Sequence, residues 1–75
     1  MICNIKKRQI FINGKIWPIT ATLVEEAVYR IAKFKKKSLV TVYILSEKGG
    51  DAYAALRIFQ VLKNGVAFVL LVNLV

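Results

Sequence analysis

The sequence predicts an α/β fold, built as a β-α-β-α-β unit with a mostly parallel three-stranded sheet. Three runs of β-forming residues, at 9–12, 39–45 and 66–75, alternate with two segments whose apolar residues recur at helical spacing. The second and third runs are apolar at both odd and even positions, which is typical of parallel strands covered on both faces. Parallel strands that are joined by helices cross over in the right-handed sense.

The first strand is short, from Gln9 to Ile12, and Asn13-Gly14 closes it because this pair favours a turn. Pro18 is expected in the loop that follows. Trp17 is interpreted as an apolar anchor of that loop, with a role at an interface as the alternative.

The first helix is expected to begin near Thr22. The Thr22 hydroxyl and the Glu25 carboxylate three residues later match a capping box, in which each side chain bonds a backbone N–H. One apolar face then repeats at helical spacing: Val24, Ala27, Val28, Ile31 and Phe34. Lysines finish the helix, where positive charge complements its dipole: Lys33, Lys35, Lys36 and Lys37.

The second helix spans about Asp51 to Lys63 and stops at Asn64-Gly65, a pair suited to a helix C-cap. Asp51 is interpreted as its N-cap, accepting N–H bonds from the first turn. We expect this helix to bury one apolar face: Ala52, Ala55, Leu56, Phe59 and Leu62.

One consequence of this topology concerns the far side of the sheet. If the sheet grows in one direction, both helices lie on the same face. The opposite face, lined by about half of the apolar residues of the second and third strands, is then bare. A bare apolar face predicts a missing domain, an oligomer or aggregation.

The composition places residues 1–75 in one small domain, 57% apolar or aromatic, with a net charge of +8. Only about 60% of the unfolded surface is buried at this size, so such a chain exposes apolar surface or hides it against a partner. The single Cys3, expected near a frayed N-terminus, allows no internal disulfide, favours a cytoplasmic location and has no companion metal ligand. We expect no membrane partner, because the longest apolar run, 66–72, is too short to span a bilayer.

The most informative motif is the Gly49-Gly50 turn between the second strand and the second helix. Two glycines permit a sharp turn and a close backbone approach. The helix that follows points free N–H groups at whatever occupies the turn. The motif therefore predicts an anion or oxyanion site, with a simple strand-to-helix turn that needs positive φ as the alternative.

Two segments resemble the proteolytic subunit of Clp protease. Residues 8–16, RQIFINGKI, resemble the first strand and turn of that family, R-x-I-x-L-x-G-x-I. Residues 42–46, VYILS, followed by 49–59, GGDAYAALRIF, resemble its signature Y-I-N-S-P-G-G-S-V-x-A-G-L-x-I-Y-D. The Gly-Gly-Asp variant also occurs in related phage prohead proteases. The resemblance covers residues 8–75 and implies part of a Clp/crotonase-like domain.

What the resemblance implies is a hydrolase, an ATP-dependent serine endopeptidase in a ring-shaped oligomer with an AAA+ unfoldase as partner. It assigns the backbone N–H of Gly50 to an oxyanion hole and Gly49 to the turn. Asp51, Ala52 and Tyr53 would line an extended peptide substrate. No cofactor is implied.

The chain departs from the family in ways that remove the chemistry. Lys48 stands where the family has proline, or is inserted there, and no histidine is present to act as general base. Aligned without gaps, the chain ends at Val75, one residue before the family serine. We therefore expect a truncated, catalytically inactive fragment. The alternatives are a non-catalytic interaction or oligomerisation module and a small basic nucleic-acid-binding protein.

Other candidate groups have ordinary structural interpretations beside the chemical ones. Ser46 with Lys48 forms a serine–lysine pair, or a common turn. Glu25 and Glu26 point about 100° apart on a helix, which fits a solvated capping turn and not an acid–base pair. The basic clusters at 6–8 and 33–37 neutralise phosphates in one interpretation and solubilise a helix end in the other. They match no known nucleic-acid-binding module, so nucleic acid is not the expected partner.

Overall fold

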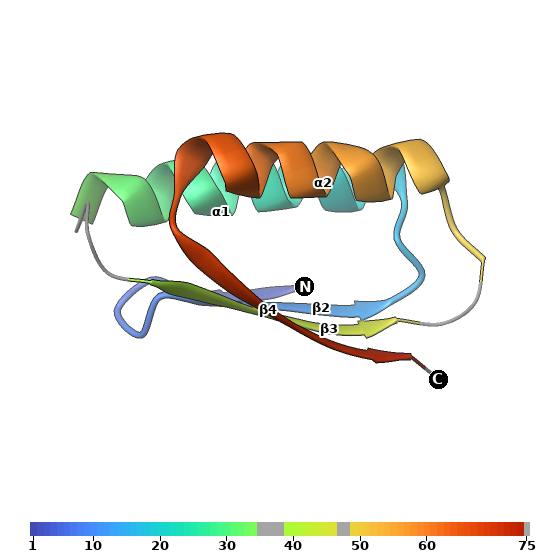
Figure 1. Cartoon of the computed structure of the whole chain (residues 1–75), viewed down its shortest axis with the longest axis horizontal. Helices are drawn as coiled ribbons and strands as arrows, with labels where there is room; N and C mark the ends of the chain where they lie inside the picture. The colour runs from blue at the N-terminus through green and yellow to red at the C-terminus, as the bar shows by residue number, and fades with distance from the viewer. Residues whose placement is uncertain (35–38, 47–48, 75) are drawn as a thin grey trace.

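The computed structural model describes residues 1–34, 39–46 and 49–74. Two helices pack on one four-stranded sheet, so the molecule has two layers (Figure 1). The elements follow in the order β1 (Ile2–Asn4), β2 (Gln9–Gly14), α1 (Pro18–Phe34), β3 (Val40–Ser46), α2 (Ala52–Gly65) and β4 (Phe68–Leu74). The α/β class is therefore confirmed, and the spatial order of the strands is β1-β2-β3-β4.

The prediction of a three-stranded sheet is wrong, because the N-terminus adds a fourth strand. β1 pairs with β2 in the antiparallel direction, with Cys3 opposite Ile10, so the sheet is mixed. The turn between them is closed by the Arg8 N–H, which donates to Ile5 O at 3.1 Å. Cys3 therefore lies in a strand and not in a frayed end. A three-residue strand is too short to leave a periodic signal.

Arg8 holds this hairpin against the end of α1. Its side chain is buried, and its guanidinium Nη1 donates to Ile31 O at 3.2 Å. Its φ of 54° is positive, which is uncommon outside glycine. Arg8 is thus part of the fold and does not join Lys6 and Lys7 in an exposed basic cluster.

The predicted start of the first helix is also wrong. α1 begins at Pro18, four residues before Thr22, with proline at the first helical position, where its missing N–H costs nothing. The Trp17 N–H donates to Thr20 Oγ1 at 3.1 Å, and Trp17 O accepts the Thr20 N–H at 2.9 Å. Thr22 Oγ1 instead donates to Pro18 O at 3.4 Å inside the helix, so no capping box forms with Glu25.

The apolar face predicted for α1 is confirmed for the side chains that the structure describes. Val24, Ala27, Val28 and Ile31 are all buried. Lys33 is the basic residue of the last turn. The Phe34 side chain and Lys35, Lys36 and Lys37 fall outside the described residues.

α2 follows Asp51, whose predicted role as N-cap is confirmed. Its Oδ1 accepts the N–H groups of Tyr53 at 2.8 Å and Ala54 at 3.1 Å. The helix ends at Gly65, near the expected point, but the C-cap is Val66, whose N–H donates to Leu62 O at 3.1 Å. A Cβ at Gly65 would lie 2.6 Å from Val28 Cγ1, so glycine is needed for the close approach of the two helices.

The face that α2 buries was predicted wrongly, except for Leu62. Ala54, Ile58 and Leu62 point inward, whereas the other predicted core positions are exposed: Ala52, Ala55, Leu56 and Phe59. The two sets lie about 100° apart around the helix axis, a rotation of one residue. Both faces are apolar, so the pattern alone could not select the one that packs against α1.

The sheet grows in one direction, and both helices lie on the same face, as predicted (Figure 1). β3 is parallel to β2 and to β4, with Ile44 opposite Ile12 and Val72. The core between the layers is apolar and consists of Ile10, Ile12, Ala21, Val24, Ala27, Val28, Ile31, Val40, Val42, Ala54, Ile58 and Leu62. Within the described part of the chain, neither helix has the length and apolar character needed to cross a bilayer.

Candidate functional site

The Gly49-Gly50 turn lies at the carboxyl ends of the parallel strands, and both of its residues have positive φ, 97° and 87°. A Cβ at Gly50 would meet Ile16 O at 2.6 Å. The next N–H, that of Asp51, donates to Ile16 O at 2.7 Å. The turn therefore requires glycine for two reasons, its conformation and its contact with the segment that leads into α1.

Two of the N–H groups predicted to be free at the start of α2 are bonded within the fold. The Asp51 carboxylate bonds those of Tyr53 and Ala54, and it places a negative charge where an anion would sit. A Cβ at Gly49 would lie 3.7 Å from Lys15 Nζ, so one ammonium group lies beside the turn. Among the described residues, nothing accepts a hydrogen bond from the Gly50 N–H. The oxyanion role of this group stays a prediction.

The three residues expected to line a peptide have unequal exposure. Asp51 is partly buried, Ala52 is exposed, and Tyr53 is 85% exposed. They lie together on the first turn of α2 beside the glycines. The Ser46 side chain and Lys48, the other members of this loop considered above, fall outside the described residues.

The carboxylates Glu25 and Glu26 each face an arginine. Glu26 Oε1 lies 2.6 Å from Arg30 Nη2 on the next turn of α1. Glu25 Oε2 lies 3.6 Å from Arg57 Nη2 on α2. Both pairs are exposed, and such pairs contribute little to stability. They do not form an acid–base pair, and they do not cap the helix, because α1 begins a full turn earlier.

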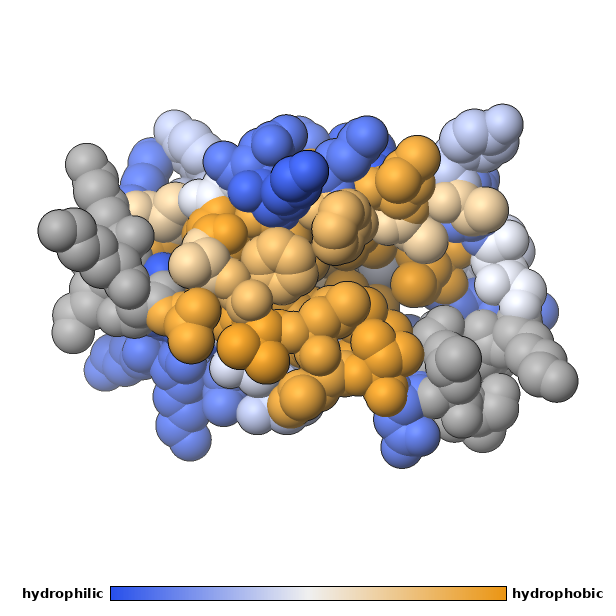
Figure 2. All heavy atoms as spheres, viewed as in Figure 1, coloured by the Kyte–Doolittle hydropathy of each residue, from blue (hydrophilic) through white to orange (hydrophobic). Residues whose placement is uncertain are grey.

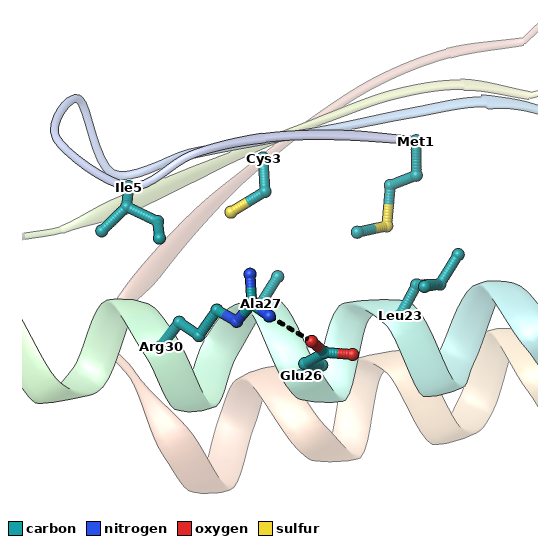
Figure 3. Close-up of a pocket in the computed structure, with 7 residues that line it drawn as sticks. All are labelled: Met1, Cys3, Ile5, Leu23, Glu26, Ala27 and Arg30. Carbon is teal, nitrogen blue, oxygen red and sulfur yellow. Dashed lines mark hydrogen bonds and ion pairs between the residues drawn. The ribbon is translucent and has the colours of Figure 1, made fainter.

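Cys3 lines a cavity of about 150 Å³ between β1 and α1 (Figure 3). Burial raises the pKa of its thiol above the ordinary value of 9.0, and the nearby Arg30 charge offsets this only in part. The neutral thiol is therefore favoured, which makes Cys3 a weak nucleophile. Across the described residues, no group of His, Cys, Asp or Glu side chains could hold a metal ion.

The face of the sheet that lies opposite the helices is apolar along its centre, as predicted. The strand registers place Ile2, Phe11, Tyr43 and Leu71 in one row across all four strands. The Phe11 and Tyr43 rings stack with centroids 4.7 Å apart and planes 5° from parallel. The rows on either side include polar residues: Asn4, Gln9, Thr41, Asn13 and Asn73. We call this side of the sheet the open face.

The outer edge of β4 is apolar and has no strand beside it among the described residues. Four consecutive side chains are exposed, Val69 at 41%, Leu70 at 40%, Leu71 at 48% and Val72 at 53%. The Val40 N–H donates to Ala67 O at 2.9 Å, which sets the alternation of backbone groups along β4. The N–H and C=O groups of Phe68, Leu70, Val72 and Leu74 therefore point outward, away from β3.

The apolar surface continues from the edge of β4 onto α2. Its exposed apolar side overhangs β4, where Phe59 meets the Phe68 ring edge-to-face with centroids 6.2 Å apart. A cavity of about 200 Å³ opens beneath, lined by both elements and including Ala55 and Leu70. Figure 2 shows the resulting apolar region across α2 and β4. We call it the edge surface, and it consists of Ala55, Leu56, Phe59, Val69, Leu70, Leu71 and Val72.

Sequence reasoning found half of this surface. The sequence predicts β4 as a strand, but its apolar residues at both parities predict burial on both faces. The helical spacing places the exposed apolar residues of α2 in the core. The signal that could have found the surface is the width of the α2 apolar region, which covers more of the helix than packing against one sheet and one helix requires.

No model of a protein family matches the chain, and no curated protein is significantly similar to it.

Proposed function

We propose that this chain is a non-catalytic protein-interaction module that binds an extended partner strand along the free edge of β4. The observation that carries the proposal is the edge surface, where exposed apolar side chains accompany outward backbone groups. An unpaired apolar edge of this kind is a template for a further strand. Strand addition supplies main-chain hydrogen bonds, and burial of the side chains makes the pairing favourable.

The contrast with a catalytic role also supports the proposal. The sequence contains no histidine. The carboxylates of Glu25 and Glu26 face arginines, and the Asp51 carboxylate caps α2. The only described cysteine has a raised pKa. These carboxylates are already paired or cap a helix, whereas the edge surface is available to a partner.

The experiment uses a fluorescent peptide of eight alternating valine and threonine residues, which is uncharged and forms extended strands. We expect saturable binding to the protein, measured by fluorescence anisotropy at low protein concentration. Val72→Pro removes an outward N–H, and proline is tolerated on a strand edge that faces solvent. This variant should keep its circular dichroism spectrum and bind at least tenfold more weakly. Val72→Thr, which keeps the N–H, is the matched control.

Equal peptide binding by Val72→Pro and the wild-type protein would reject the β4 edge as the binding site. Absence of peptide binding by the wild-type protein under conditions in which it is monomeric would reject the interaction module itself.

A second candidate is descent from the Clp protease fold, with the peptide-lining segment kept and the peptidase activity lost. It is supported by the consecutive positive-φ glycines and by the Gly50 N–H, which lies beside exposed Ala52 and Tyr53. We expect no hydrolysis of fluorogenic peptides and no labelling by a fluorophosphonate. Under this proposal Tyr53→Lys, and not Val72→Pro, weakens peptide binding. An AAA+ unfoldase as partner rests on the resemblance alone.

A further inference from the structure

We infer that the strand that pairs with β4 is β4 of a second copy, running antiparallel about a two-fold axis at Leu71. The inference rests on the proposed function and names its partner. The two four-stranded sheets would become one continuous sheet, with all helices on the same side.

The breadth of the edge surface favours a second copy over a lone peptide. A single added strand covers β4 but leaves Leu56 and Phe59 of α2 in water. A two-fold axis perpendicular to the sheet keeps both α2 helices on one side, so each brings its exposed apolar side toward the other. Stable interfaces bury about 800 Å² on each partner, and a second copy would bring α2 as well as β4 to the contact.

The distribution of charge also favours a second copy as the partner. The chain carries a net charge of +8, yet residues 64–75 contain no charged side chain. A partner strand that carried charge at its helix-facing positions would have to bury it between the α2 overhang and the sheet, at a large desolvation cost. β4 of a second copy brings none. Pairing β4 with the other free edge, β1, would use only three residues and would repeat without closing.

The outward backbone groups fix the register. In antiparallel pairs, two residues that face each other exchange both hydrogen bonds when their N–H and C=O groups point across the pair. With the axis at Leu71, Leu70 faces Val72 of the second copy, and Phe68 faces its Leu74. This register uses every outward residue from Phe68 to Leu74, whereas any shifted axis leaves some of them unpaired. Leu71 then faces Leu71 of the second copy in a non-hydrogen-bonded pair, on the open face.

The experiment is disulfide trapping in a Cys3→Ser background. Non-hydrogen-bonded antiparallel pairs bring Cα atoms to about 4.5 Å, within the range that a disulfide accepts. Leu71→Cys should therefore form a covalent dimer under mild oxidation at least tenfold faster than Val69→Cys. The control residue is on the same face of the same strand and is similarly exposed, but it faces Asn73 of the second copy.

Sedimentation velocity at tens of micromolar completes the test. We expect a dimer that strengthens with added salt, because salt screens the repulsion between two copies of charge +8. A monomer at every concentration and salt level would overturn the inference, as would equal trapping of the two cysteine variants. If such a monomer still binds the valine–threonine peptide, only the second copy is rejected. If it binds no peptide either, the proposed function falls with it.

Discussion

The Gly49-Gly50 turn and the edge surface lie on the same small domain and use their polar groups in opposite ways. At the turn, the Asp51 N–H is bonded to Ile16 O, and the first N–H groups of α2 are bonded to the Asp51 carboxylate. At the edge, β4 presents outward N–H and C=O groups among exposed apolar side chains. The motif that resembles a catalytic signature bonds several of its polar groups within the fold, whereas the outer edge of β4 has no strand beside it among the described residues.

We expect the largest loss of stability from a methyl group added at the Gly49-Gly50 turn. Gly50→Ala places a Cβ 2.6 Å from Ile16 O at a positive φ. We expect the free energy of unfolding to fall by about 3 kcal/mol, measured by urea denaturation. Gly14→Ala is the control, because its φ is also positive but no atom lies within 4 Å of the added Cβ. It should cost about 1 kcal/mol. Equal costs would show that the contact with Ile16 is unimportant.

The edge surface should respond in the opposite way, with association lost and stability kept. Leu56→Lys introduces a charge on the exposed side of α2. We expect the dissociation constant of the dimer to rise at least tenfold in sedimentation equilibrium. The free energy of unfolding at low concentration should change by less than about 0.5 kcal/mol. Tyr53→Lys, at a more exposed position of the same helix, is the matched control and should leave association unchanged. A larger effect of Tyr53→Lys on the dissociation constant would contradict the assignment of the dimer interface to the edge surface.

Removing the cap of α2 should have a smaller effect on stability than Gly50→Ala. Asp51→Ala removes the acceptor of two N–H bonds and should lower the free energy of unfolding by about 1 kcal/mol. Asp51→Ser restores an acceptor of the type preferred at this position and should recover most of the loss. Thermal unfolding followed by circular dichroism measures both. A neutral Asp51→Ala would mean that water replaces the carboxylate without cost.

The smallest expected effect concerns Cys3. Because burial raises its pKa, the folded protein keeps the thiol proton at a pH where the unfolded chain has lost it. The associated stability is present below pH 9.0 and declines as the pH rises above that value. Cys3→Ala should remove this part of the decline, which urea denaturation between pH 8 and 10 would detect as a shallower slope. An unchanged slope would assign the decline to other groups.

The main features of the fold were predictable because they leave repeating patterns. The parallel strands and the buried face of α1 follow from apolar periodicity, and the N-cap from Asp51. The bare face followed from topology, since one-directional growth puts both helices on one side. Each of these features depends on a pattern that repeats along a segment or on the order of the segments.

The rest was not predictable, because it depends on contacts between distant segments. The start of α1 is set by Pro18 and Thr20, whereas Thr22 and Glu25 imitate a cap one turn later. The buried side of α2 is chosen by the approach of Gly65 to Val28, which periodicity does not contain. Of the N–H groups expected to be free, those of Tyr53 and Ala54 are bonded by the Asp51 carboxylate, which spacing alone does not decide.

We expect the buried Arg8 side chain to link the unfolding of two segments that are distant in the sequence. Its guanidinium joins the β1–β2 turn to Ile31 O near the end of α1, residues that are 23 positions apart. Opening either segment breaks that bond, so we expect the hairpin and the end of α1 to open together. In native-state hydrogen exchange, the amides of β1 and those near Ile31 would then share one opening free energy. The amides of β1 would therefore exchange together with those at the end of α1, although the two segments are more than twenty residues apart in the sequence.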